Sequence, residues 1–168
     1  MRFAYADPPY PGYAGYYPEQ TEVDQPRLIH QLVHEYPDGW ALSTKSSALR
    51  ELLPLCPDDV RVLAWVKPYT PFRAGVTVAY AWEPVLVRGG RKRPRTEDTV
   101  RDWHLESASL NGRILIGAKP PGFCHWVLDV LYALPGDEIV DLFPGTGAFT
   151  RAMTARLDPP RQLLLAMS

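Results

Sequence analysis

The sequence predicts an α/β domain built on a parallel-type sheet. Short apolar runs alternate along the chain with segments whose apolar residues recur at helical spacing, which is typical of such a sheet. The chain has 168 residues, enough for one domain with a buried core, so we expect a single domain over residues 1–168. Proline occurs 18 times, and much of it lies where the predicted segments end.

The first half of the chain is predicted to contain three strands and two helices. Phe3–Ala6 is a short apolar run, and Asp7-Pro8-Pro9 ends it because neither proline can donate to a sheet. Asp24 is a suitable N-cap and Pro26 suits the first turn of a helix that Pro37-Asp38-Gly39 ends. The other expected elements are a strand over Trp40–Thr44, a helix from Ser46 or Ser47 to Leu53, and a strand over Val60–Val66.

The second half begins with a predicted strand or hairpin arm over Val78–Arg88. Within it, Pro84 favours a bulge or an edge position, because proline lacks the backbone N–H group. The remaining expected elements are a helix over Gly122–Leu134, a strand over Glu138–Phe143, a helix from the following Gly-rich loop to about Arg156, and a last strand over Gln162–Met167.

Two predicted strands end in unusual loops. "DPPY", Asp7 to Tyr10, follows one strand, and "FPGTGAF", Phe143 to Phe149, follows another. Ligands of parallel α/β sheets bind beyond the carboxyl ends of the strands, so we expect these two loops to flank one site.

The Gly-rich loop has the composition of a ligand-binding turn. Gly145 and Gly147 let the backbone approach a ligand closely, and the helix that follows offers N–H groups at its positive end. Thr150 stands where a dinucleotide fingerprint would have a third glycine, and the Gly-Lys-Ser/Thr of a phosphate-binding loop is absent. The alternative is an ordinary glycine turn between a strand and a helix.

The DPPY segment suits chemistry on an aromatic amine. The Asp7 carboxylate and the Pro8 carbonyl can accept the two hydrogens of the exocyclic amine of adenine, which frees the nitrogen lone pair. Proline holds these acceptors in place, and Tyr10 can stack on a base taken out of its helix. Such catalysis relies on positioning and electrostatics and needs no metal. A strand that simply ends in a proline turn is the alternative.

With these motifs the chain resembles the amino-group DNA methyltransferases that use S-adenosylmethionine, in their permuted order with the catalytic motif first and the cofactor motif last. "DPPY" resembles the catalytic motif of the adenine-N6 branch. Residues 117–149 are similar, in order and spacing, to the Lys-Pro helix, Pro-Gly-Asp turn and Asp-x-Phe-x-Gly-x-Gly loop of the family. "AWVKP" and "YAWEPVLVRGGRK" resemble two further strands of these enzymes.

The resemblance implies a Rossmann-like sheet with helices on both faces, in a minimal version. Only Gly89–Ala118 fills the place of the family's target-recognition domain. The implied reaction is methylation of the N6 amine of adenine in DNA, with S-adenosylmethionine as the cofactor. The implied catalytic residues are Asp7, Pro8, Pro9 and Tyr10. The implied cofactor-binding residues are Lys119, Pro120, Asp141, Phe143, Gly145, Thr146 and Gly147.

The expected partner is nucleic acid, with DNA foremost. The run "RGGRKRPR" supplies the residues predicted to contact phosphates, which are Arg91, Lys92, Arg93 and Arg95. A flexible charged loop is the alternative for this run. A homodimer or a separate partner is considered for sequence recognition. Alternatives for the function are methylation of cytosine N4, of RNA or of a free nucleotide, and a non-catalytic nucleic-acid-binding partner subunit.

Composition sets several bounds on the function. The formal net charge of −1 shows no overall basicity. No metal site is expected, because His30 and His34 have no apparent third ligand and Cys56 and Cys124 lack metal-binding spacing. The sequence shows no membrane span and no signal-peptide layout, so a cytoplasmic location is expected.

Overall fold

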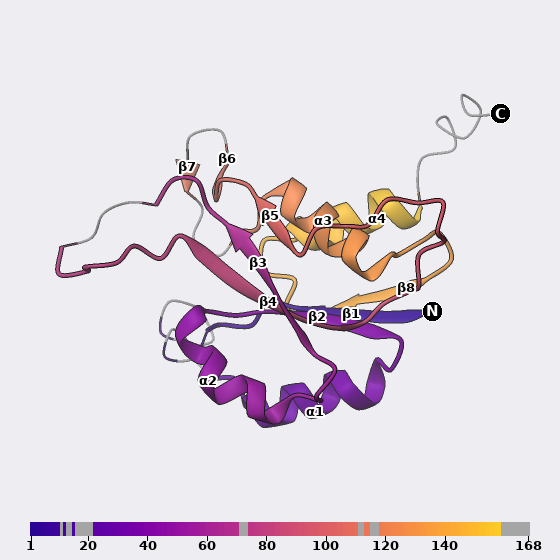
Figure 1. Ribbon diagram of the computed structural model, residues 1–168, viewed down its shortest axis with the longest axis horizontal. Helices are drawn as coiled ribbons and strands as arrows, with labels where there is room; N and C mark the ends of the chain where they lie inside the picture. The colour runs from indigo at the N-terminus through magenta and orange to yellow at the C-terminus, as the bar shows by residue number, and fades with distance from the viewer. Residues whose placement is uncertain are drawn as a thin grey trace.

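The computed structural model describes residues 1–10, 12, 15, 22–70, 74–110, 113–114 and 118–158. Among these residues a six-stranded sheet has the order β5-β3-β4-β2-β1-β8, and β6 and β7 form a separate hairpin pair (Figure 1). The strands are β1 (Arg2–Ala6), β2 (Gly39–Ser43), β3 (Arg61–Val66), β4 (Trp82–Gly89), β5 (Trp103–Leu105), β6 (Ser109–Leu110), β7 (Arg113–Ile114) and β8 (Glu138–Asp141). The last predicted strand, Gln162–Met167, lies outside the described residues.

The sheet is mixed. Strand β1 pairs in parallel with β2 and β8, and β3 pairs in parallel with β5. Strand β4 is antiparallel to both of its neighbours, β2 and β3. The predicted parallel-type sheet is therefore correct around β1 and wrong for β4. Within the described residues no helix lies between β3 and β4, and a parallel pair would need such a crossover.

The expected edge or bulge position of Pro84 is also wrong, because β4 lies between β3 and β2. The register explains how a central strand accepts this proline. Pro84 is opposite Ala64, whose N–H group donates to Asp102 on the far side of β3. On the other side, Pro84 lies one residue beyond the last paired position of β2, where its carbonyl accepts from Thr44. The missing N–H group therefore falls at the end of the β2–β4 pairing.

Helices cover both faces of the sheet, as the sequence predicts (Figure 1). One face carries α1 (Gln25–Glu35) and α2 (Leu49–Leu52), with the 3₁₀ turns η2 (Ser46–Ala48) and η3 (Leu53–Leu55) around α2; the other carries α3 (Pro121–Leu131) and α4 (Ala148–Leu157). Side chains of β1 alternate between the two cores. Phe3 and Tyr5 lie in the core with α3 and α4, and Ala4 and Ala6 in the core with α1.

Local signals explain where the helices begin and end. The Asp24 side chain accepts the N–H of Arg27 at 3.0 Å and caps α1, as predicted. The helix expected to run to Leu53 ends at Leu52, where Pro54 cannot donate the next helical hydrogen bond. Helix α3 ends at Leu131, before its predicted end, because Tyr132 adopts a left-handed conformation with φ of 52°.

Two further expectations concern membranes and metals. Within the described ranges, none of the helices is both long and apolar enough to cross a bilayer. The same part of the chain holds no group of three or more His, Cys, Asp or Glu side chains that could bind a metal ion.

The amino end of β8 is held by a buried carboxylate. Asp137 accepts from the Met1 amine at 2.7 Å, from Arg91 Nη2 at 2.5 Å and from the backbone N–H of Leu134 at 2.8 Å. Its side chain is only 3% exposed. Burial opposes ionisation, but these donors outweigh it and hold the pKa of Asp137 at about 2, below the ordinary value of 3.8.

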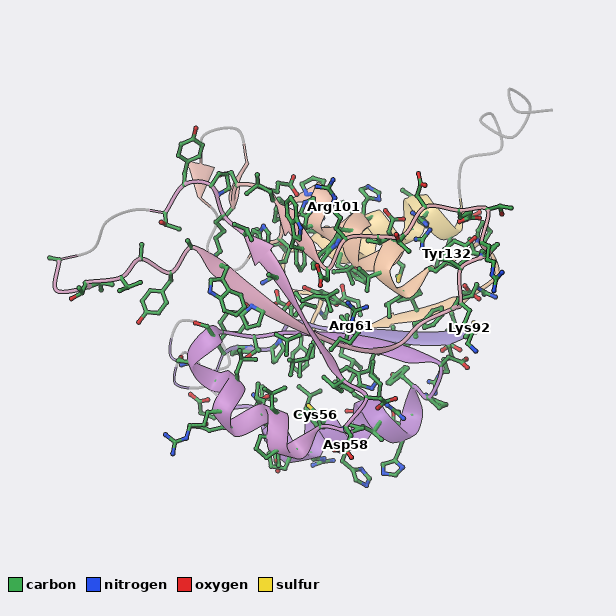
Figure 2. All side chains as sticks on the ribbon, viewed as in Figure 1. Cys56, Asp58, Arg61, Lys92, Arg101 and Tyr132 are labelled. Carbon is green, nitrogen blue, oxygen red and sulfur yellow. The ribbon has the colours of Figure 1, made fainter. Side chains whose placement is uncertain are left out.

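Replacing Asp137 by asparagine is expected to destabilise the fold at neutral pH by about 1.5–3 kcal/mol, the usual range for hydrogen bonds to a charged group. Because the folded pKa lies below the unfolded one, this contribution is complete above roughly pH 4 and is lost as the pH falls toward 2. Urea unfolding from about pH 7 to about pH 3 measures it. The exposed Asp58, below the sheet in Figure 2, supplies the control Asp58→Asn. An Asp137→Asn deficit that stays constant with pH would contradict this account.

Candidate functional site

The two loops singled out in the sequence lie side by side. Strands β1 and β8 are parallel neighbours, with Tyr5 opposite Asp141, so their carboxyl ends meet at one edge of the sheet. Asp7–Tyr10 leaves from β1 and the Gly-rich loop leaves from β8 at this edge. The expected proximity of the two loops is confirmed.

Lys119, at the entrance to α3, contacts the DPPY segment directly. Its Nζ donates to Asp7 Oδ1 at 2.8 Å and to the Tyr10 hydroxyl at 3.2 Å. The lysine is 7% exposed, and Asp7 and Tyr10 are partly buried. Lys119 was predicted to bind the cofactor together with Pro120, which is the N-cap of α3. The structure places its ammonium group on the predicted catalytic residues.

Two residues absent from the predicted site complete the arrangement. Glu83 Oε2 accepts the Tyr10 hydroxyl at 2.6 Å and lies 3.7 Å from Lys119 Nζ. Lys67, which follows β3, forms a salt bridge with the other oxygen of Glu83. We call Asp7, Tyr10, Lys67, Glu83 and Lys119 the charge cluster. "AWVKP" and "YAWEPVLVRGGRK" contain Lys67 and Glu83, but nothing in the local sequence indicates that these strands meet Tyr10.

Burial and charge pairing have opposite effects within the charge cluster. Burial raises the pKa of Asp7, and the nearby Lys119 partly offsets this. Burial also acts to raise the pKa of Glu83, but Lys119, Lys67 and the hydrogen bond from Tyr10 hold it below its ordinary value. Burial, with Asp7 and Glu83 next to it, raises the pKa of Tyr10 well above 10. Glu83 is therefore an ionised acceptor and Tyr10 a protonated donor.

The Gly-rich loop has the backbone of a ligand-binding turn. Gly145 and Gly147 have φ of 46° and 74°, in the left-handed region that favours glycine. Gly147 is the N-cap of α4, and no side chain caps the helix there. The first N–H groups of α4 are thus available to a ligand. Of the other residues predicted for the cofactor, Phe143 is partly buried against the core that contains α1, and Thr146 is exposed.

Asp141 has one satisfied and one unsatisfied oxygen. Thr150, the residue in the place of the third fingerprint glycine, donates its hydroxyl to Asp141 Oδ2 at 2.7 Å. Asp141 Oδ1 is buried and has no hydrogen-bond partner among the described residues. A buried carboxylate oxygen without a donor is costly, and a bound donor or cation would satisfy it. This oxygen, together with the uncapped α4, fits a polar cofactor in the loop.

The basic run lies away from this site. Its four predicted phosphate-binding residues follow Gly89, which is opposite Gly39 at the beginning of β2. They therefore leave the sheet at the end of the strands that is opposite to the DPPY segment. Arg91 binds Asp137, and Arg93 donates to the carbonyl of Asp129 at 2.7 Å and covers the ring of Tyr132. Lys92 and Arg95 are exposed. Figure 2 shows Lys92 and Tyr132 at the right, where Figure 1 marks the N-terminus. The four side chains predicted to bind phosphates are therefore not next to the charge cluster.

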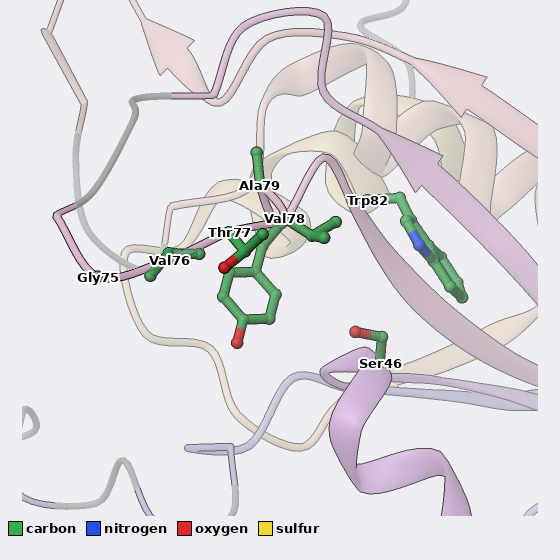
Figure 3. A pocket seen from close by; sticks show the side chains of 8 residues that line it. Ser46, Gly75, Val76, Thr77, Val78, Ala79 and Trp82 are labelled. Atoms are coloured by element: carbon green, nitrogen blue, oxygen red, sulfur yellow. The ribbon is translucent and has the colours of Figure 1, made fainter.

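A pocket of about 410 Å³ lies between the beginning of β4 and the η2 turn (Figure 3). Ser46, Trp82 and residues 75–80 line it. Successive residues of a strand point to opposite faces, so Trp82 and its neighbour Glu83 project from opposite sides of β4. The part of the pocket that Trp82 lines therefore lies on the face of β4 opposite to Glu83.

The mixed sheet with helices on both faces is a Rossmann-like fold of the kind found in S-adenosylmethionine-dependent methyltransferases. Two solved structures similar to this chain are those of M1.HpyAVI. Its complex with S-adenosylmethionine matches with a TM-score of 0.61 and 15% identity, over 90% of this chain and 76% of that chain. A second structure of M1.HpyAVI matches with a TM-score of 0.54 and 14% identity, over 90% of this chain and 74% of that chain. No family model matches the sequence, and no curated protein is significantly similar to it.

Proposed function

We propose that this protein is an S-adenosylmethionine-dependent methyltransferase that methylates the N6 amine of adenine in DNA. The observation that carries the proposal is the pairing of β1 with β8, which brings Asp7 and the Gly-rich loop to one edge of the sheet. The similarity of the fold to M1.HpyAVI supports methyl transfer from S-adenosylmethionine as the reaction class. The DPPY segment supports adenine as the target base.

The Gly-rich loop and its neighbours would hold the cofactor. Gly145 and Gly147 leave room for the ligand beside the backbone, and the uncapped end of α4 offers N–H donors. Asp141 Oδ1 would accept from a donor or cationic group of the cofactor. Bound S-adenosylmethionine supplies an activated methyl group. The other residues proposed for its binding are Phe143, Thr146, Pro120 and Lys119.

The DPPY segment would hold the amine that receives the methyl group. The Asp7 carboxylate and the Pro8 carbonyl accept its two hydrogens, so that the nitrogen lone pair points away from them. Lys119 favours the ionised form of Asp7 by its charge and by its hydrogen bond, although burial opposes ionisation. An ionised carboxylate is the stronger acceptor as positive charge develops on the amine. Tyr10 supplies an aromatic face for the base.

The substrate is proposed to be single-stranded or distorted DNA. Direct readout of a duplex needs several side chains presented to the major groove, and the segment between β4 and α3 is short. A paired base must also be extruded at a cost of a few kcal/mol, which a small protein has few contacts to offset. Lys92 and Arg95 remain the exposed candidates for phosphate contacts in the basic run, at the far edge of the sheet. A second subunit or a partner is the alternative source of recognition.

Incubation with methyl-labelled S-adenosylmethionine tests the function. The substrates are matched oligonucleotides as single strands and duplexes, in DNA and RNA, and the product nucleosides are analysed. We expect N6-methyladenine in DNA, with more product on the single strand. N4-methylcytosine as the product would identify the amine of cytosine as the target. More product on RNA than on DNA would identify RNA as the substrate. Binding of the oligonucleotides without cofactor binding or product would identify a non-catalytic nucleic-acid-binding protein.

A further inference from the structure

We propose that Glu83 is a positioning residue for the methyl-transfer reaction, acting through Tyr10 and Lys119. The inference rests on the proposed function and extends it to a strand outside both sequence motifs. Strand β4 runs antiparallel to β2, so its beginning, not its end, reaches the edge of the sheet that holds the DPPY segment. Glu83 is the second residue of this strand, and its side chain is 19% exposed.

The hydrogen bonds around Tyr10 run in one direction. Lys119 donates to the Tyr10 oxygen at 3.2 Å, and an ammonium group cannot accept a hydrogen bond in return. The Tyr10 hydroxyl therefore gives its own proton to Glu83, at 2.6 Å. Two contacts thus fix the phenol oxygen, one from the entrance of α3 and one from β4. The ring that would stack on the target base is held at its far end by Glu83.

Glu83 also competes with Asp7 for Lys119. The lysine Nζ lies 2.8 Å from Asp7 and 3.7 Å from Glu83. Lys67 balances part of the Glu83 charge from the end of β3. The charge cluster therefore contains two carboxylates and two ammonium groups, with Lys119 between the carboxylates. Loss of the Glu83 charge would remove one of the two carboxylates that attract Lys119 within the charge cluster.

This arrangement predicts how Glu83→Gln changes the turnover number, the KM for the cofactor and the pH–rate profile. The turnover number should fall about 10–100-fold, in line with the loss of a hydrogen bond to a charged group, because Tyr10 is no longer held. The KM for the cofactor should change less than the turnover number, because Glu83 is bonded to Tyr10 at 2.6 Å and lies 3.7 Å from Lys119, the residue that it shares with the proposed cofactor site. At the same time the acid side of the pH–rate profile should move to lower pH, because the negative charge of Glu83 raises the pKa of Asp7.

The direction of that pH shift separates positioning from a general loss of structure. The groups that act on Asp7 are Lys119, which lowers its pKa, and Glu83 and Asp141, which raise it. Removing Glu83 leaves the other two in place, so the shift is downward. Glu83→Asp keeps the charge and should restore the wild-type position of the acid limb. The exposed Glu138, at the opposite edge of the sheet, supplies the control Glu138→Gln, which should leave rate and profile unchanged.

Tyr10→Phe removes the same hydrogen bond without removing a charge. If stacking alone mattered, this variant would retain nearly full activity, since the ring is preserved. The contact with Glu83 instead predicts a loss similar to that of Glu83→Gln. In the double variant, which combines Glu83→Gln with Tyr10→Phe, the turnover number should fall by less than the product of the two single fold-losses, because both substitutions remove the same contact. Fully multiplicative losses would overturn the proposal.

A second measurement does not depend on activity. Protein labelled with ¹³C at the tyrosine phenol carbon is titrated by NMR, and the Tyr10 signal among the nine tyrosines is assigned by its absence in Tyr10→Phe. Glu83 raises the pKa of Tyr10, so this phenol should ionise at lower pH in Glu83→Gln than in the wild type. An unchanged Tyr10 titration, or wild-type turnover in Glu83→Gln, overturns the role of Glu83. A moved Tyr10 signal in a protein that transfers no methyl group overturns the proposed function instead.

Discussion

Replacement of Asp7 by alanine is expected to lower the turnover number by a factor of about 10² or more, the loss typical of a single preorganised electrostatic group. The carboxylate accepts a hydrogen of the amine as the nitrogen takes on positive charge, so its contribution is greatest in the transition state. Binding of S-adenosylmethionine, measured by calorimetry, should change much less. Asp7 follows β1, whereas most of the residues proposed to hold the cofactor lie at the end of β8 and in the loop after it.

Stability must be followed in the same variant, because Asp7→Ala leaves the buried Lys119 without its hydrogen bond to Asp7. Asp7→Asn is the closer test, since it keeps the shape and one acceptor oxygen but removes the charge. Its turnover should lie between those of the wild type and of Asp7→Ala. Asp58→Asn, on an exposed turn, should behave as the wild type. Comparable turnover in the wild type and in folded Asp7→Ala would refute the proposed chemistry.

Replacement of Gly147 by valine is expected to abolish measurable binding of S-adenosylmethionine. Gly147 is the N-cap of α4, with φ of 74°, where a β-branched residue is strained. The new side chain would occupy space beside the loop and displace its backbone from the left-handed conformation. The strain is about 1–2 kcal/mol, which is small against the ~5–15 kcal/mol that stabilises a typical domain, so the fold should survive.

Gly136 provides the matched control for this strain. Its φ is 89°, and a Cβ atom there would meet nothing within 4 Å. It belongs to the turn between α3 and β8, at the edge of the sheet opposite the candidate site. Gly136→Val therefore carries a similar backbone penalty without approaching the Gly-rich loop. Calorimetry should find wild-type cofactor affinity in Gly136→Val and no binding in Gly147→Val. Equal affinity in both variants would mean that the Gly-rich loop is only a turn.

Local chemistry made part of this molecule predictable from its sequence. Asp24 and Pro26 mark the first turn of α1, and the proline pair after Ala6 ends β1. Gly145 and Gly147 indicated a loop that needs left-handed backbone, and both residues have positive φ. Each of these signals acts within a few residues of chain, so no knowledge of the tertiary arrangement is needed to interpret it.

Long-range pairing was beyond the reach of such signals. The direction of β4 depends on the path of the chain after β3, and a buried parallel strand and a buried antiparallel strand have the same apolar character. The antiparallel direction is also what brings Glu83 to Tyr10, so the missed direction and the missed site residue have one cause. The basic run suggested a phosphate-binding patch, but Arg91 and Arg93 instead hold parts of the same chain together.

The position of β1 next to the outermost strand β8 has a consequence for folding during synthesis. Its neighbours in the sheet are β2 and β8. Strand β2 follows within about forty residues, since Phe3 is opposite Gly39. Strand β8 comes much later, since Arg2 and its partner Glu138 are 136 residues apart in the chain. While the ribosome makes the intervening chain, one edge of β1 has no strand to pair with. Unpaired strand edges invite association with other chains. The nascent protein therefore has an unpaired strand at one side of its sheet, and β8 covers this strand only when it emerges near the end of synthesis.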